Sequence, residues 1–545
     1  MSYRAKLSQY FGQRDRGWVL SLFGAVCLLY LPFLGNPFIF DDLTFFLGGV
    51  AQKYANTSFD FTLRWLPYAS LGWTEVWFSS VVTHFFHLGN LLLHAANVIV
   101  LFYLLRLLMA AAIPDLKDSP AVVWGAWFGA LIFALHPVAV YAAGYVVQRS
   151  ILMATFFALL MQLAYLRGLL SGQVRWLALA AAAYFLAVFS KEHSVMVPAL
   201  LAAQTVLLRP QVRASARALW PAWTAFFAIG LAIILRAKGV FGTPYEALAA
   251  DLFERQGIVE GGATLHLLSA FTQAGLFFKY LWLWLLPNPA WMALDMREPF
   301  VHSFAEWRGW LGALGFLAYG ATGFWLLLRP RWAGVAGLAL LYPWLQFKLE
   351  FSSIRVQEPF VLYRSYLWMP GLMLFFPLLL SKWPERRTMI ALGLVALLLA
   401  PLAANRLWVF ADGYRLWNDA ALLLPDDQVA GADRILFNRG QASAARNRWD
   451  AAIADFERAA VISPQYAPVR FELGWAYGVK GRYQDAMVQF DAAIADDPNF
   501  ANAYYGKAML LKMRGEHKQA AELMAKSCEL KHAMACLITK GHVEH

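Results

Sequence analysis

Apolar residues occupy most of the first three quarters of the chain, in runs long enough to cross a lipid bilayer as helices. One crossing needs about 20 mostly apolar residues. Runs of this kind lie at 17–35, 85–112, 120–141, 150–170, 175–190, 194–208, 217–236, 307–328, 332–347, 365–381 and 387–405. A further run, 264–287, ends at Pro287-Asn288-Pro289 and is predicted to lie along the outer membrane face or to re-enter it. The pattern predicts an all-α polytopic membrane domain with about eleven transmembrane helices.

From about residue 433 the pattern becomes that of a soluble domain and repeats itself. Like residues recur 34 positions apart at Gly440 and Gly474, Ala452 and Ala486, Phe456 and Phe490, Ala459 and Ala493, and Pro464 and Pro498. This period resembles tetratricopeptide repeats, in which antiparallel helix pairs stack into an α-solenoid. We therefore predict a membrane domain over 1–405, a connecting helix within 406–432 and a repeat domain over 433–545. Such repeats generally present a concave surface to a protein, although a plain structural cap is the alternative.

Composition and charge support the membrane assignment. Of the 545 residues, 60% are hydrophobic and 15% are charged, whereas soluble domains carry about 25% charged residues. The net charge of +11 belongs to 1–405, because 406–545 hold equal numbers of basic and acidic residues. The basic residues lie between apolar runs and form no clustered patch, so nucleic acid is a poor partner.

The basic residues also predict the orientation of the helices, since cytoplasmic loops are enriched in Lys and Arg. With a cytoplasmic N-terminus (Arg4, Lys6, Arg14, Arg16), the alternate loops are basic as well: Arg106 with Lys117, Arg167 with Arg175, Arg209 with Arg213 and Arg217, Arg329 with Arg331, and Lys382 with Arg386 and Arg387. This topology predicts a multi-pass protein of the bacterial inner membrane whose repeat domain is periplasmic.

Two adjacent carboxylates, Asp41 and Asp42, directly follow the first apolar run. A carboxylate pair beside the bilayer can act as a general base or hold a divalent cation such as Mg²⁺ or Mn²⁺. The alternative is a solvated helix cap.

Three short segments place cations at the outer ends of predicted helices: Gln148-Arg149, Lys191-Glu192-His193 and Tyr363-Arg364. Arg suits bidentate contact with a phosphate, and Lys supplies a point charge. Together with the carboxylates, these segments indicate a site for a phosphate-bearing lipid. Each cation taken alone is also compatible with snorkelling to lipid headgroups.

Histidine and cysteine leave further alternatives open. His87 and His94 roughly share a helix face, but no carboxylate or cysteine completes a metal site there, so packing or headgroup contact is favoured for them and for His136. Cys528 and Cys536 are too far apart to bond within one helix, whereas a turn near Lys531-His532 would allow a disulfide. The loop 237–263 suits a lid over an outer cavity.

Taken in order, these motifs resemble the GT-C fold glycosyltransferases, and more closely the TMTC-type protein O-mannosyltransferases and their bacterial relatives, which carry terminal tetratricopeptide repeats. The matching segments are Phe40-Asp41-Asp42, Leu92-Leu93-His94-Ala95-Ala96-Asn97, Leu135-His136-Pro137 with Val147-Gln148-Arg149, Ser190-Lys191-Glu192-His193, Leu285-Leu286-Pro287-Asn288, and Leu362-Tyr363-Arg364-Ser365-Tyr366-Leu367.

The resemblance implies an enzyme that moves a sugar from a polyprenyl-(di)phosphate donor to a hydroxyl of a periplasmic acceptor, with protein Ser/Thr as the expected class. By this analogy Asp41, with Asp42 as its partner, deprotonates the acceptor. Arg149, Lys191 and Arg364 bind the lipid phosphate, and Glu192, His193, Tyr363, His94 and His136 belong to the same substrate site. The competing hypotheses are a glycosyltransferase acting on surface polysaccharide or lipid, and a non-catalytic repeat scaffold for envelope or pilus assembly. A transporter is disfavoured because the middles of the runs carry few charges.

Overall fold

The computed structural model describes residues 15–79, 82–117, 119–236, 262–356, 358–382 and 385–539, and in these ranges the secondary structure is helical, with no β-strand. Two compact units form. The first comprises residues 1–292 and 299–412, and the second comprises 293–298 and 413–545. The basic residues at 1–14 and the greater part of the predicted lid, 237–261, lie outside the described residues.

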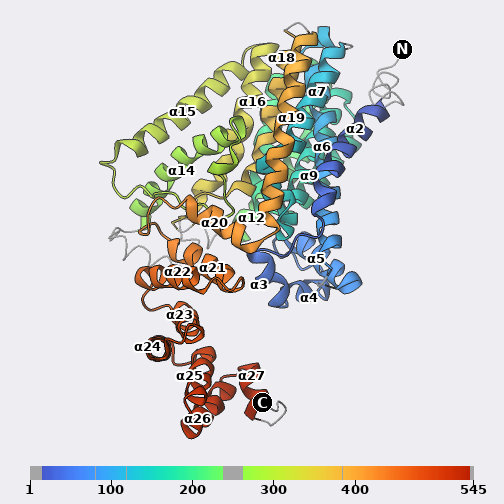
Figure 1. Cartoon of the computed structure of the whole chain (residues 1–545). Helices are drawn as coiled ribbons and strands as arrows, with labels where there is room; N and C mark the ends of the chain where they lie inside the picture. The colour runs from blue at the N-terminus through green and yellow to red at the C-terminus, as the bar shows by residue number, and fades with distance from the viewer. Residues whose placement is uncertain are drawn as a thin grey trace. The chain divides into compact units, whose positions relative to one another are not determined.

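The first unit is a bundle of helices, coloured from blue to light orange in Figure 1. Its α-helices are α2 (Arg16–Tyr30), α3 (Asp41–Leu47), α4 (Val50–Ala55), α5 (Trp65–Phe78), α6 (Thr83–Ala112), α7 (Pro120–Leu135), α8 (Pro137–Ala143), α9 (Arg149–Ser171), α10 (Val174–Ser190), α11 (Val197–Leu207), α12 (Ala216–Arg236), α14 (Gly262–Leu285), α15 (Trp307–Leu327), α16 (Trp332–Phe347), α17 (Ser365–Trp368), α18 (Phe375–Leu380) and α19 (Glu385–Phe410). Short 3₁₀ turns that matter for the site are η5 (Val146–Gln148), η6 (Glu192–Met196), η9 (Lys348–Ser352) and η10 (Leu362–Arg364).

Fewer of these helices reach membrane-spanning length than the sequence predicts. In the described ranges six are long and apolar enough to cross a bilayer, or seven if the bent pair α7 and α8 counts as one span, where about eleven were expected. Proline accounts for part of the difference, because it removes a backbone donor and ends or bends a helix. Pro137 separates α7 from α8 at a 64° bend, and the run 365–381 is divided into α17, a 3₁₀ segment with Pro370 near its start, and α18 with Pro377 in its first turn.

The run predicted not to complete a crossing forms α14, which packs beside α15 in the same direction. Successive glycines of α15 follow successive positions of α14: Gly309 lies against Phe271, Gly312 against Gly275 and Gly315 against Phe278. A Cβ at Gly312 would come 2.8 Å from the Gly275 backbone, so glycine permits the close approach. Since two consecutive helices can run parallel only if the chain returns between them, residues 286–306 lead back to the end of the bundle where α14 begins.

The second unit confirms the predicted repeat. Its helices are α20 (Gly413–Leu422), α21 (Ala432–Ala444), α22 (Trp449–Ile462), α23 (Ala467–Val479), α24 (Tyr483–Asp496), α25 (Ala501–Met513), α26 (His517–Glu529) and α27 (Ala533–Thr539). Helices α22, α24 and α26 begin 34 residues apart, and consecutive helices pair from α21 to α26. This is the helix-pair architecture of tetratricopeptide repeats.

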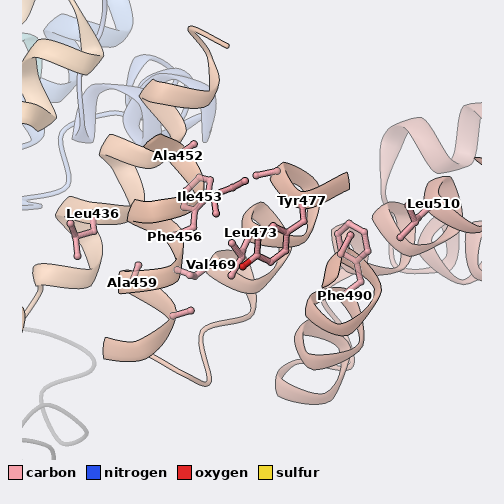
Figure 2. Close-up of a cluster of buried hydrophobic side chains, with 13 residues drawn as sticks. Leu436, Ala452, Ile453, Phe456, Ala459, Val469, Leu473, Tyr477, Phe490 and Leu510 are labelled. Carbon is pink, nitrogen blue, oxygen red and sulfur yellow. The ribbon is translucent and has the colours of Figure 1, made fainter. Parts of the chain in front are cut away.

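The small and aromatic positions of the repeat pack against one another (Figure 2). A Cβ at Gly440 would lie 2.5 Å from the Phe456 ring, and one at Gly474 would lie 2.9 Å from the Phe490 ring. Both phenylalanines are buried. The period in the sequence therefore reflects one contact made twice, in which a glycine of the first helix admits an aromatic ring of the second.

The boundary between the units lies slightly beyond the predicted one. Helix α19 continues to Phe410, and α20, within the predicted connecting segment 406–432, belongs to the repeat unit. The segment Ala293–Glu298 also belongs to that unit, although it precedes α15 in the chain. Its Arg297 is fully buried and forms an ion pair with Asp295, which also binds Arg434 of α21 at 2.8 Å.

The terminal cysteines form a disulfide. Helix α26 ends at Glu529 and α27 begins at Ala533, and Lys531 between them adopts a left-handed conformation with φ 69°. The reversal brings the Cα atoms of Cys528 and Cys536 to 4.6 Å. The structure therefore has a turn at Lys531-His532 and not one continuous helix.

Candidate functional site

A cavity of about 410 Å³ opens at the end of the first unit where α2, α10 and α16 end and α9 begins. Most of its lining is polar or charged, and the residues come from six separate stretches of the chain. They are Asp41, Thr44, Phe45, Val50, Arg64, Tyr68, Val147, Gln148, Ser150, Lys191, Glu192, His193, Arg355, Glu358, Tyr363 and Arg364. The cavity therefore brings together Asp41, Lys191, Glu192, His193, Tyr363 and Arg364, six of the ten residues predicted from sequence.

The two adjacent carboxylates have different environments. Asp41 is exposed and lines the cavity, and its backbone N–H donates a 3.0 Å hydrogen bond to the Tyr145 hydroxyl. Asp42 is fully buried and accepts hydrogen bonds from the backbone N–H groups of Val147 at 2.7 Å and Ile39 at 3.2 Å. Burial raises the pKa of Asp42 to about 8 despite these bonds. Asp41 is therefore the carboxylate placed to meet a substrate, and Asp42 holds α3 to η5.

The backbone immediately before Asp41 is strained. Phe40 has φ 48° and ψ −115°, a combination that a residue with a Cβ rarely adopts. Such conformations persist where the surrounding structure holds them, and they gather at functional sites. Here the bonds at Asp41 and Asp42 hold the turn.

Lys191 is a cavity cation held by neutral hydrogen-bond partners. Its side chain is 3% exposed, and its ammonium donates to the Gln148 amide oxygen at 3.1 Å and the Ser150 hydroxyl at 3.4 Å. It also lies 4.8 Å from the centre of the Tyr363 ring. In the described part of the chain no carboxylate forms an ion pair with it. Burial, with a smaller contribution from Arg64, holds the pKa of Lys191 well below its usual range. An anion bound in the cavity would offset both the burial of the Lys191 ammonium and its repulsion by Arg64.

The neighbouring Glu192 and His193 are held by charged partners. The Glu192 carboxylate pairs with Arg64, with a 3.0 Å bond from Nε. Burial raises the pKa of Glu192, but the charge and hydrogen bonds of Arg64 and His193 together outweigh burial and hold the pKa well below its usual range. His193 lies between two carboxylates, with Nε2 3.2 Å from Glu350 and Nδ1 3.6 Å from Glu192. This wall of the cavity is a network of alternating charges.

Arg364 is positioned by a buried carboxylate. Its guanidinium lies 3.0 Å from Glu350, and Arg355 lies 3.3 Å from the same carboxylate. Glu350 is 1% exposed, and the two guanidiniums outweigh its burial and hold its pKa below the usual range. Two arginines thus share one negative charge at the cavity wall.

Arg149 has a different place from the one predicted. It is buried and does not line the cavity. Its Nε donates to the Asn90 amide oxygen at 3.0 Å, its Nη2 to the Phe86 carbonyl at 2.9 Å and its Nη1 to the Ser70 carbonyl at 3.2 Å. The guanidinium therefore ties α5, α6 and α9 together. The expected contact between Arg149 and the lipid phosphate finds no support in this arrangement.

His94 and His136 also lie away from the cavity lining, with both ring nitrogens bonded to the protein. His94 contacts the Tyr366 hydroxyl at 2.6 Å and the Ala134 carbonyl at 3.1 Å. His136 contacts the Trp284 carbonyl at 3.1 Å, accepts from the Val138 N–H at 3.3 Å and stacks on the Trp284 indole. These contacts indicate that both histidines serve in packing, which is the role that the residue pattern favoured.

The Asp41–Asp42 pair does not fit a divalent cation. Both oxygens of Asp42 accept backbone hydrogen bonds, and only Asp41 of the two lines the cavity. In the described ranges no group of three or more His, Cys, Asp or Glu side chains is placed to hold a metal ion.

The chain is similar to solved structures over 30% of its length. These include two crystal structures of MamA, each 19% identical with a TM-score of 0.20, of which 86% and 81% are covered. A structure of YrrB, described as a TPR protein with an unusual peptide-binding site, is 21% identical with a TM-score of 0.21, and 87% of it is covered. No protein-family model matches the chain, and no curated protein does.

Sequence reasoning missed the charged cavity residues Arg64, Arg355 and Glu358, and it missed Glu350, the carboxylate that pairs with Arg355 and Arg364. A signal was available for three of them, because Glu350, Arg355 and Glu358 stand close together between two strongly apolar runs. Charges in such a setting are costly and default to functional candidates. Arg64 had no such signal, since it lies in a loop where a solvated arginine is common.

Proposed function

We propose that the protein is a glycosyltransferase that uses a lipid-linked sugar and has its active site in this cavity. The observation that carries the proposal is that an exposed carboxylate, Asp41, and a buried ammonium, Lys191, line the same cavity, and that no carboxylate of the described residues forms an ion pair with Lys191. A phosphate bound at Lys191 would restore the charge balance that burial disturbs. The sequence resemblance to GT-C glycosyltransferases points to the same chemistry.

In the proposed reaction Asp41 accepts the proton of an acceptor hydroxyl as its oxygen attacks the anomeric carbon of the sugar. A carbon–oxygen bond forms on one face while the bond to the lipid phosphate breaks on the other, so the configuration inverts. The electron pair leaves with the phosphate. Lys191 and Arg364 stabilise the charge that develops on that phosphate, the kind of preorganised electrostatic stabilisation that lowers such barriers. Glu350 positions Arg364, and Tyr145 orients the backbone at Asp41.

The two units also have a proposed location relative to the membrane. The first unit would lie in the bacterial inner membrane with the cavity at the periplasmic face, and the shorter apolar helices would complete broken crossings toward the eleven expected. The repeat unit would be periplasmic and recruit the acceptor, with protein Ser/Thr as the expected class. The parallel arrangement of α14 and α15 supports this topology. Because the chain returns between these two helices, α14 does not change the direction in which the later helices cross the membrane.

The test uses cells whose own copy of the gene is deleted and which carry the wild-type chain, the Asp41→Asn variant or the Asp115→Asn variant. It compares the intact masses of their periplasmic and surface proteins. Asp115 is a matched control, since it is an exposed carboxylate paired with Arg331 in the loop after α6. We expect a sugar-sized mass increment with the wild type and the control and its loss with Asp41→Asn. Full transfer by Asp41→Asn would remove Asp41 as the base.

The same experiment separates the competing functions. If no protein changes mass but surface polysaccharide or lipid does, the acceptor class is wrong and the transferase remains. The repeat unit favours one further candidate, a non-catalytic scaffold for envelope assembly. An assembly defect that Asp41→Asn rescues as well as the wild type does, with no change in any glycan, would favour that function.

A further inference from the structure

Five aromatic side chains form a cluster beside the cavity, which we call the aromatic wall. Phe59, Phe61 and Trp65 come from the loop before α5 and the start of that helix, and Phe185 and Phe189 come from the last two turns of α10. The ring centres of Phe59 and Phe61 lie 4.8 Å apart, and the Phe189 ring lies 5.5 Å and 6.0 Å from them. Trp65 lies 5.4 Å from Phe59, and Phe185 lies 4.6 Å from Phe189.

The outer layer of this wall is exposed although it is apolar. Phe59 is 37% exposed and Phe61 is 55% exposed, whereas Phe189 beneath them is buried. Exposed rings packed edge-on or tilted against further rings form one apolar surface rather than isolated hydrophobic residues. Contiguous apolar surfaces of this kind mark sites of binding or membrane contact.

The loop that carries Phe59 and Phe61 is held in a strained conformation. Phe61 has φ 61° and Arg64 has φ 64°, both in the left-handed region. The Asp60 carboxylate accepts the Thr62 backbone N–H at 2.9 Å, and Arg64 is bound to Glu192. A strained loop persists only where its surroundings hold it. The two exposed rings are therefore presented in a set position.

The aromatic wall adjoins the charged cavity along the chain at two places. Arg64 lies between Phe61 and Trp65 in the chain and lines the cavity, as does its partner Glu192. Phe189 stands two residues before Lys191 at the end of the same helix, α10. At both places an apolar surface and the charged cavity are therefore close neighbours along the chain.

We propose that the aromatic wall binds the phosphate-proximal isoprene units of the donor's polyprenyl chain while the cavity holds its phosphate. This inference rests on the proposed function and names the part of the donor that this surface recognises. Isoprene units are branched, unsaturated and without hydrogen-bonding groups, so they pack on ring faces and are driven there by burial of apolar surface. The charge change at Lys191 matches the change from hydrocarbon to phosphate along such a lipid.

Bulk bilayer lipid is the other occupant that such a surface accepts, because aromatic residues commonly lie at membrane interfaces. Bilayer contact alone requires no particular relation to a charged cavity. The aromatic wall lies next to the cavity residues Arg64 and Lys191 along the chain, which favours a ligand with an apolar and an anionic part in one molecule.

The test measures binding of undecaprenyl phosphate, isopentenyl phosphate and inorganic phosphate to the full chain in nanodiscs. The variant is Phe59→Ala/Phe61→Ala, and the control is Trp220→Ala/Phe227→Ala, which removes two exposed aromatic side chains of α12. We expect the wall variant to bind undecaprenyl phosphate about tenfold more weakly, the loss of about two aromatic contacts. The affinity of the wall variant for inorganic phosphate should not change. The affinity of the control variant for all three probes should not change either.

Three outcomes would contradict the inference in distinguishable ways. If the wild type binds undecaprenyl phosphate and the wall variant binds it equally well, the tail site is wrong and the proposed function stands. Equal loss in the wall variant and the α12 control would assign the surface to bilayer contact. If the wild type binds no probe, the proposed donor class fails and the tail site with it.

A second measurement keeps the inference testable if the double variant folds poorly. With p-benzoylphenylalanine in place of Phe61, irradiation should cross-link the chain to undecaprenyl phosphate, and excess undecaprenyl phosphate without the label should compete. A matched label in place of Trp220 should give no competed cross-link. A competed cross-link at Trp220 alone would overturn the assignment.

Discussion

The carboxylate of Asp42 accepts the backbone N–H of Val147 at 2.7 Å through one oxygen and that of Ile39 at 3.2 Å through the other. This double acceptance joins the start of α3 to η5 and leaves the neighbouring Asp41 facing the cavity. Two carboxylates adjacent in sequence therefore have separate tasks, one structural and one chemical. The difference leads to opposite predictions for the same substitution at the two positions.

Asp42→Asn should destabilise the fold. The amide supplies one acceptor and one donor where the structure requires two acceptors, so one backbone N–H is left facing an N–H donor. The expected cost is about 1–3 kcal/mol, that of a buried hydrogen-bonding group without a partner. Thermal unfolding of the full chain in detergent measures it. An unchanged midpoint would show that the two bonds contribute nothing to stability.

Asp41→Asn should leave the unfolding midpoint unchanged and remove sugar transfer. The side chain is exposed, so its isosteric replacement disturbs no packing. Loss of a general base lowers rates by about 10²–10⁴-fold. Transfer in membranes, assayed beside Asp115→Asn, provides the measurement, and near-normal rates for Asp41→Asn would assign the base elsewhere.

The wild type should lose stability relative to Asp42→Asn as the pH rises from about 4 to about 8. Burial raises the pKa of Asp42 to about 8 in the folded protein, above the ordinary value of 3.8. Between these values the unfolded chain releases a proton that the folded chain retains, so the free energy of unfolding falls with pH. The contribution is complete below about pH 4 and is lost through about pH 8. A parallel pH dependence of the two midpoints would contradict the raised pKa.

Lys191→Met should abolish binding of undecaprenyl phosphate, and Lys191→Arg should retain it with an altered pH profile. Burial holds the pKa of Lys191 below its usual range, so the wild type should bind more weakly as rising pH removes the proton. Arginine stays charged throughout and should flatten that decline. Identical pH profiles for the wild type and Lys191→Arg would show that another group titrates.

Cys528→Ser should loosen the end of the repeat unit. The disulfide closes a short loop between α26 and α27, and a cross-link of this length contributes about 2–3 kcal/mol in the chain-entropy account. Hydrogen exchange of α27 should rise while that of α22 does not change. In cells, alkylation without reductant should leave both cysteines unmodified if the unit is periplasmic, because such bonds form in oxidising compartments. Full alkylation would contradict that placement.

Phe456→Ala should destabilise the first repeat by about 3–5 kcal/mol, because it empties the space beside Gly440. Gly440→Ala places a Cβ against the same ring and should cost about 1–3 kcal/mol by overpacking. The combined variant should cost less than the two single costs added together, since the new methyl group then faces the space left by the ring. Strict additivity, measured by unfolding of the full chain, would show that the two positions are not coupled.

The repeat unit was the most predictable part of the molecule. One contact, a glycine against a phenylalanine, recurs with the chain period, so local spacing already contains the tertiary information. The charged cavity was predictable in part, since Asp41, Lys191 and Arg364 stand at the ends of apolar runs, where a charge is costly. Six or seven helices of the described ranges reach spanning length where about eleven spans were expected, because a run of apolar residues does not show where the helix within it bends or ends.

The sequence by itself determined that the chain is helical, that an apolar unit precedes a repeat, and which charges stand at helix ends. Only the tertiary structure decided the use of each charge. Arg149 and Lys191 look alike in sequence, but the Arg149 guanidinium donates to neutral acceptors of neighbouring helices while Lys191 lines a cavity. The physical reason is that a buried charge is defined by the partners around it, and those partners come from segments far apart in the chain.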